Sequence, residues 1–163
     1  MRAMVARLQR EMPDAKVRTQ ESDAAKLPES DGEFDLILCD VPCSGTGTLA
    51  RNPEIKLRLE PVELPRQAKR QKEILAAALK RLALGGCLVY STCSLEPEEN
   101  EAVLAAVLEK MSGVERVGIE SVLQKLTLRR DTSGLVHEGN LRTLPGVGFN
   151  GDGFFAAVVE RKS

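Results

Sequence analysis

The sequence has little of what marks a disulfide-stabilised, metal-binding or membrane protein. Its four cysteines form no Cys-x-x-Cys pair and His137 is its only histidine, so neither a disulfide framework nor a structural zinc site is expected. No apolar run approaches the length of a membrane span, and the first residues lack the apolar core of a signal peptide. We therefore expect a soluble, cytoplasmic protein with no bound metal and no membrane contact.

The chain also lacks an excess of charge of either sign. Its net charge is −1 over 163 residues, so the overall electrostatics favours neither nucleic acid nor a membrane surface. Residues 51–72 depart from this balance, with seven basic residues against three acidic ones. The stretch follows a cysteine-containing loop and predicts a basic rim beside it, although solvated charge on a loop and a helix explains the same pattern.

The apolar patterning predicts an α/β fold. Near-continuous apolar runs at 34–40 and 87–91 are typical of buried strands, and 154–159 resembles a closing strand. Helical spacing predicts helices over 66–83, stopped by Gly85 and Gly86, and from Pro97 to about residue 111. Weaker patterns predict a helix over 2–12 and strands over 16–19 and 114–120, with 121–150 rich in loops. Together they predict one domain over residues 1–163 with a mainly parallel sheet.

Two cysteines each follow one of the predicted strands, and they are the strongest functional signal. Cys43 lies in the sequence Asp-Val-Pro-Cys-Ser-Gly-Thr-Gly (40–47), and Cys93 lies in Ser-Thr-Cys-Ser (91–94). Chemistry collects at the carboxyl ends of parallel strands. A helix opening near Pro97 would favour the thiolate of Cys93, the reactive form, although unpaired cysteines are also common in protein cores. Asp40 ends its strand after apolar residues, so its carboxylate must be solvated, paired or functional.

A nucleotide-binding alternative fails on its context. Residues 45–50 match the G-x-G-x-x-A fingerprint, but Pro42 and Cys43 separate it from the strand. Pro53 lies where the required helix should run, and no acidic residue ends a following strand at the required spacing.

The cysteine motifs, together with residues 51–56, 71–75, 85–101 and 152–155, resemble the NOP/Sun family of RNA cytosine-5 methyltransferases, and its bacterial ribosomal RNA branch in particular. The likeness is ordered along residues 5–110 and 150–161. It implies a Rossmann-like, S-adenosylmethionine-dependent methyltransferase fold and an RNA substrate whose target base is unstacked. It would make the basic residues Arg51, Lys56 and Arg58 candidates for RNA binding.

The resemblance also assigns roles at the site. Cys93 would attack carbon 6 of the target cytosine, and Cys43 would release the covalent adduct. Asp40 would contact the cytosine. S-adenosylmethionine would be bound by Asp23, which would contact its adenine, together with Asp40 and Pro42.

The sequence departs from the family upstream. The glycine-rich cofactor loop and the first two strands that the family carries have no counterpart before residue 13. We therefore expect an N-terminally truncated catalytic domain with an incomplete cofactor site, inactive without upstream sequence. The loss would leave an apolar edge at residues 36–38, predicting a rearranged sheet, an edge-paired homodimer or a separate N-terminal segment that covers it.

Two other classes of function remain open at this point. One is a non-catalytic remnant or interaction module that keeps the cysteine loops but cannot hold the cofactor. The other is a thiol-redox protein, which requires the alpha carbons of Cys43 and Cys93 to lie within about 7 Å of each other.

Overall fold

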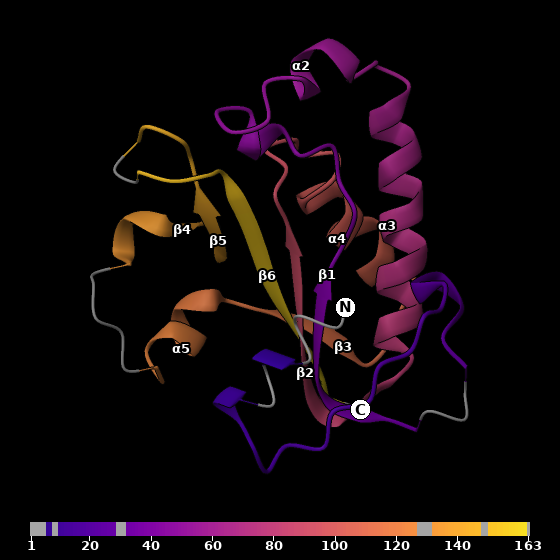
Figure 1. The fold of residues 1–163 in the computed structure, drawn as a ribbon. Helices are drawn as coiled ribbons and strands as arrows, with labels where there is room; N and C mark the ends of the chain where they lie inside the picture. Colours follow the sequence, from indigo (N-terminus) through magenta and orange to yellow (C-terminus); the bar gives the residue numbers. More distant parts are fainter. Residues whose placement is uncertain (1–5, 8–9, 29–31, 127–131, 148–149, 163) are drawn as a thin grey trace.

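The computed structural model describes the chain apart from residues 1–5, 8–9, 29–31, 127–131, 148–149 and 163. The described residues form one six-stranded sheet with helices packed against it (Figure 1). In chain order the elements are η1 (Ala24–Lys26), β1 (Phe34–Asp40), η3 (Thr46–Thr48), α2 (Ile55–Arg58), α3 (Glu63–Leu79), β2 (Leu82–Thr92), α4 (Glu101–Leu108), β3 (Val114–Val117), α5 (Ile119–Leu123), η4 (Ser133–Leu135), β4 (Val136–His137), β5 (Asn140–Thr143) and β6 (Phe154–Arg161).

Strands β1 and β2 carry the two cysteine loops. They pair in parallel, with Asp40 opposite Ser91 at their carboxyl ends. The register shifts near their start, where β2 holds extra residues around Gly85, whose φ is +74°. The glycines predicted to stop the preceding helix therefore lie within an irregularity of β2. Because the pairing is parallel, the chain leaves both strands at the same edge of the sheet.

The prediction of an α/β fold is confirmed, but that of a mainly parallel sheet is wrong for the described strands. The order is β1-β2-β6-β5-β4, with β3 also on β6, and only the β1–β2 pair is parallel. β4 and β5 are joined through Glu138 and Gly139, which both have positive φ. Such a tight turn can only join antiparallel strands.

The core lies between the sheet and the two helices α3 and α4, which lie side by side (Figure 1). Alternate residues of β2 and β6 point into it, among them Tyr90 and Phe155, whose rings meet edge to face at 6.5 Å. The helices supply apolar side chains at helical spacing. The fully or almost fully buried apolar residues of these four elements include Leu75, Leu79, Leu82, Leu88, Val103, Leu104, Ala157 and Val159.

Both predicted helices exist with shifted ends. α3 begins three residues before residue 66 and ends at Leu79, because β2 already starts at Leu82. α4 begins at Glu101, because residues 97–100 form turns rather than helix. The N-terminal positive end expected near Pro97 therefore lies further along the chain.

The weaker predictions had mixed outcomes. Residues 16–19 form no strand, since they have no neighbouring strand to pair with in the described chain. Of the predicted helix 2–12, residues 6–7 and 10–11 are helical, and 2–5 and 8–9 lie outside the described residues. The predicted strand 114–120 divides at Gly118 into β3 and α5. The short strands β4 and β5 were not predicted in the loop-rich region.

β1 forms one edge of the described sheet, as the sequence predicted. Leu36 and Leu38 are 68% and 71% exposed, and no other described strand pairs with the outer edge of β1. The sheet has not rearranged to cover this edge. None of the described helices has both the length and the apolar character that crossing a membrane requires.

Candidate functional site

The two cysteine loops meet at the carboxyl ends of β1 and β2. The sulfur atoms of Cys43 and Cys93 lie 3.2 Å apart, and both side chains are partly buried. The meeting follows from the strand register, which continues when the N–H of Val41 donates to the Ser91 carbonyl at 3.1 Å. The sequence predicted that both cysteines would lie at this edge, and the structure brings them into contact.

Backbone hydrogen bonds close the loops against each other. The N–H of Gly47 donates to the Cys93 carbonyl at 2.9 Å, and the N–H of Gly153 donates to the Gly47 carbonyl at 2.7 Å. A Cβ added at Gly47 would lie 2.4 Å from the Gly153 carbonyl oxygen and 2.8 Å from that of Cys93. Only glycine allows the three segments to approach this closely.

Burial changes the acidity of Cys43. Loss of solvent, followed by the hydrogen bond and the charge of the neighbouring Cys93 sulfur, raises the pKa of its thiol to about 12. Backbone N–H groups of Gly45 and Cys93 oppose this shift in part. Cys43 therefore holds its proton at neutral pH.

Asp40 and Pro42 flank the cysteine pair on the β1 side. Both residues are exposed. The Asp40 carboxylate accepts a hydrogen bond from the Ser91 hydroxyl at 2.9 Å, and the Pro42 carbonyl accepts one from the Gln71 amide at 2.9 Å. A carboxylate at this position can contact a ligand that lies over the strand ends.

Asp23 occupies a different part of the molecule. Its carboxylate caps η1 by accepting the N–H of Ala25 at 3.1 Å. The residues of η1 share a surface hollow with the C-terminal half of α3, whereas Cys43 shares one with Glu63 and Gln67 near the start of that helix. The carboxylate of Asp23, which was expected to contact the cofactor, is thus already bound to the backbone of η1, whose residues line a different hollow from Cys43.

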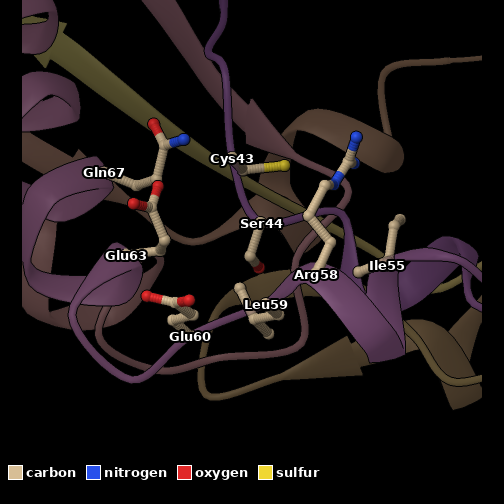
Figure 2. A pocket seen from close by; sticks show the side chains of 8 residues that line it. All are labelled: Cys43, Ser44, Ile55, Arg58, Leu59, Glu60, Glu63 and Gln67. Carbon is tan, nitrogen blue, oxygen red and sulfur yellow. The ribbon is translucent and has the colours of Figure 1, made fainter.

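A cavity of about 450 Å³ opens beside Cys43 and Ser44 (Figure 2). Arg58 of α2 lines it and is the one basic residue of the predicted rim among the residues that line this cavity. Glu60 and Glu63 also line the cavity (Figure 2), so it is of mixed charge rather than uniformly basic.

The other two basic candidates lie outside this cavity. Arg51 pairs with Asp152, its Nε donating to a carboxylate oxygen at 3.1 Å. Lys56 is exposed on α2. The expected RNA-binding residues therefore follow one another along the loop and helix after the Cys43 motif without forming one cluster with the cysteines.

Sequence reasoning missed a buried polar network behind the cysteines. Glu99 is fully buried and accepts hydrogen bonds from Ser44 and from the Gln71 amide. Glu99 stands beside Glu96 and Glu98 in the sequence, and such a run of acidic residues is typical of the start of a helix. Its local charge pattern gave no signal that one of the three is buried.

A further pair of buried residues continues the network. The Thr92 hydroxyl donates to the Asn100 amide oxygen at 2.6 Å, and the Asn100 amide donates to the Ser94 carbonyl at 3.0 Å. These bonds fix the segment on both sides of Cys93. In the part of the chain that the structure describes, no three His, Cys, Asp or Glu side chains are grouped as metal ligands would be.

Comparisons of the sequence and of the structure with known proteins both find similarity to methyltransferases. The family model described as 16S rRNA methyltransferase RsmB/F matches residues 2–160. Ribosomal RNA small subunit methyltransferase B of Enterobacter sp. (strain 638) is 41% identical over 129 residues, which is 79% of this chain and 27% of the relative. The protein of the same name from Escherichia coli (strain K12) is 37% identical over 130 residues, 80% of this chain and 27% of its own length.

Solved structures share the fold at similar identity. NSun6 from Pyrococcus horikoshii with SFG superimposes with a TM-score of 0.75 at 28% identity, covering 99% of this chain and 38% of that one. A methyltransferase homologue from Pyrococcus horikoshii superimposes with a TM-score of 0.70 at 31% identity, over 98% and 50% of the two chains. The chain therefore has the Rossmann-like methyltransferase fold in part, and spans about a quarter of the length of the curated relatives.

Proposed function

Because the chain belongs to the RsmB/F family of 16S rRNA methyltransferases, we propose that it is the C-terminal part of an RNA cytosine-5 methyltransferase that acts through Cys93 and Cys43. The observation that carries this proposal is the 3.2 Å separation of the two sulfur atoms at the ends of β1 and β2. A reaction that uses one cysteine to attack a base and another to release it needs both at the same carbon–carbon bond.

The chemistry assigned to the two cysteines balances as an addition followed by an elimination. The Cys93 thiolate forms a bond to carbon 6 of cytosine, and the electron pair of the 5,6 double bond moves to carbon 5, which takes the methyl group. Asp40, hydrogen-bonded to the ring and amino nitrogens, would favour the accompanying change of charge. In release, carbon 5 loses its proton and the bond between sulfur and carbon 6 breaks. We assign Cys43 to accept that proton, which requires the thiol, held protonated by burial in the free chain, to have lost its own proton beforehand.

S-adenosylmethionine fits the residues of this chain only in part. Asp40 and Pro42 are exposed at the end of β1, next to the open edge of the sheet, and could contact a cofactor there. Asp23 could contact it only from the η1 cap. The sequence holds no glycine-rich turn before β1, so these residues would hold one side of the cofactor, which supplies the methyl group when bound.

We propose that a segment upstream in the full-length protein, or supplied as a separate chain, pairs with β1 and completes the cofactor site. The unpaired edge of β1 and the exposed Leu36 and Leu38 support this proposal. A second copy of this chain pairing edge to edge is the other occupant, and the size of the complex distinguishes the two.

Ribosomal RNA is the substrate that we propose from the names of the relatives. Arg58 beside the Cys43 cavity, with Lys56 and Arg51 on the adjoining segment, would contact phosphates rather than bases. A target cytosine must leave its stack to reach the cysteine pair, which suits a single-stranded or loop region.

The test compares two single variants of the chain, supplied with an upstream segment from a relative, methyl donor and small-subunit ribosomal RNA. Cys93→Ala should abolish methyl transfer, whereas Cys43→Ala should leave a covalent protein–RNA adduct on a denaturing gel. Cys87→Ala is the matched control, because Cys87 lies within β2 away from the loops. An adduct formed by Cys93→Ala would overturn the assignment.

The second candidate is a non-catalytic module that keeps the cysteine loops. The Asp23 carboxylate, expected to bind the cofactor, instead caps η1, and this contact favours it. Calorimetric titration with S-adenosylmethionine of the chain supplied with the upstream segment separates the two: binding supports the enzyme, and no binding supports the module.

A further inference from the structure

Glu99 is a buried carboxylate held only by uncharged donors. Its side chain is 0% exposed. It accepts the Ser44 N–H at 2.9 Å, the Ser44 hydroxyl at 2.5 Å and the Gln71 amide at 3.0 Å. No ion pair recorded for the described residues includes it. Burying a carboxylate in this way is costly, and well-packed apolar residues often stabilise a fold better, so its presence calls for a role other than stability.

The donors that Glu99 engages belong to the Cys43 loop on both sides of the cysteine. Ser44 follows Cys43 directly and is held through its backbone and its hydroxyl. Gln71 binds Glu99 with the same amide nitrogen that donates to the Pro42 carbonyl at 2.9 Å. The residues immediately before and after Cys43 are therefore both fixed, one through Gln71 and one by Glu99 itself.

The same network reaches the second cysteine. The Ser44 hydroxyl lies 3.1 Å from that of Ser94, the residue after Cys93. Glu99 also follows Cys93 closely in sequence, and its carbonyl accepts the Tyr90 hydroxyl at 2.6 Å. The backbone of Glu99 is thus bound to β2, and its side chain binds the Cys43 loop through Ser44. Glu99 therefore links the Cys43 loop to the strand that precedes Cys93.

We propose that Glu99 is a positioning residue that holds Cys43 against Cys93, acting through Ser44 and Gln71. The inference rests on the proposed function and deepens it, because it names the group that fixes the geometry between attack and release. Glu99 contacts no reacting atom. Its role is to keep two loops from different strands at a fixed separation.

The role is one of geometry, and this makes a glutamine substitution informative. In Glu99→Gln, the remaining oxygen can accept the Ser44 N–H and the Gln71 amide, and the new amide can donate to the Ser44 hydroxyl. Glu99→Ala removes every one of these bonds. We expect Glu99→Gln to keep the two sulfur atoms together and Glu99→Ala to separate them.

The experiment measures the two thiols directly in the 163-residue chain and needs no methyl transfer. Phenylarsine oxide joins two neighbouring thiols through two arsenic–sulfur bonds with loss of water, and mass spectrometry identifies the bridged peptides. For Glu99→Ala we expect capture between Cys43 and Cys93 to weaken about tenfold, the effect of losing one well-formed buried hydrogen-bonded contact. Glu98→Ala, an exposed carboxylate on the same turn, is the matched control and should capture like the native chain.

Cys39 reports whether a variant is still folded. It is 7% exposed in the core, so it should stay protected from iodoacetamide unless the domain opens. Weakened capture with Cys39 protected, and capture retained in Glu99→Gln, supports the proposal. Unchanged capture in Glu99→Ala, or equal loss in both variants, overturns it.

If Glu99→Ala does not fold, Ser44→Ala tests the same link. It removes the hydroxyl that joins Glu99 to Ser94 while keeping the backbone contact. Capture that is weakened in this variant supports the proposal, and unchanged capture contradicts it. Failure of methyl transfer by the native chain, supplied with its upstream segment, would bear on the proposed function alone.

Discussion

The sulfur atoms of Cys43 and Cys93 lie 3.2 Å apart, although 50 residues separate the two cysteines in the chain. A disulfide bond would be about 2.05 Å long, so this is a contact between two unbonded sulfur atoms. The parallel pairing of β1 with β2 brings the loops together, and the Glu99 network and the Gly47 hydrogen bonds hold them there.

The contact predicts that a small-molecule disulfide such as glutathione disulfide oxidises the two thiols to a disulfide between Cys43 and Cys93. Cys93 would first form a mixed disulfide and release one glutathione, and Cys43 would then displace the second. Peptide mass spectrometry should find Cys43 and Cys93 linked, with two hydrogens lost. Cys43→Ser should instead keep glutathione on Cys93. A native chain that carries only glutathione adducts would contradict the prediction, and with it the thiol-redox alternative.

Stability should fall as pH rises above about 9. Burial raises the pKa of Cys39 to about 11 and that of Cys43 to about 12, and it also raises the pKa of Tyr90. The unfolded chain releases these protons near pH 9–10 and the folded chain does not, so the stability present below pH 9 is lost as pH rises towards the folded pKa values. Urea unfolding at pH 8, 9 and 10 measures the slope. Cys39→Ala should reduce the loss of unfolding free energy between pH 8 and pH 10. An unchanged loss in this variant would refute the assignment to Cys39.

Gly47→Ala should destabilise the domain and separate the cysteine loops. The added methyl group would meet the carbonyl oxygens of Gly153 and Cys93 at 2.4 and 2.8 Å, and backbone must shift to relieve it. We expect a loss of about 1–3 kcal/mol in the free energy of unfolding, measured by urea denaturation. Gly134→Ala is the control, because a Cβ there meets nothing within 4 Å. Equal stability of the two variants would show that the loops tolerate the displacement.

Lysine at the exposed positions of β1 should reduce self-association. Leu36 and Leu38 present apolar side chains on an unpaired strand, and charge on an edge strand discourages pairing. We expect Leu36→Lys with Leu38→Lys to lower the sedimentation coefficient of the isolated chain and to change the free energy of unfolding by no more than about 0.5 kcal/mol. Leu57→Lys on α2, where the leucine is 90% exposed, should leave association unchanged. If the native chain sediments as a uniform monomer, the edge of β1 does not pair with a second copy of the chain.

The sequence predicted those parts of the fold that depend on local pattern. The apolar runs at 34–40, 87–91 and 154–159 are strands, because continuous burial of that length leaves few alternatives. The meeting of Cys43 and Cys93 followed from their positions after two parallel strands. Strand direction elsewhere could not be predicted in the same way, because β4 and β5 are two and four residues long and are fixed by the turn between them and by β6.

The buried network was beyond prediction for a different reason. Glu98 and Glu99 are adjacent and chemically identical, yet one is exposed and the other fully buried. Their difference arises from the direction in which residues 97–100 turn before α4 begins, and from the Ser44 and Gln71 donors that other segments bring to the site. The spacing of acidic residues in the sequence predicts neither the direction of this turn nor the presence of these donors.

The bond from Gly153 to the Gly47 carbonyl has a consequence for the timing of synthesis. Gly153 follows Cys93 by 60 residues, so a ribosome adding about 5–20 residues per second exposes both thiols for several seconds before that bond can form. During that interval neither β6 nor its preceding turn exists to hold the loops. The two cysteines are therefore most open to oxidation and mispairing while the chain is being made, and the arrival of its last strand ends that period.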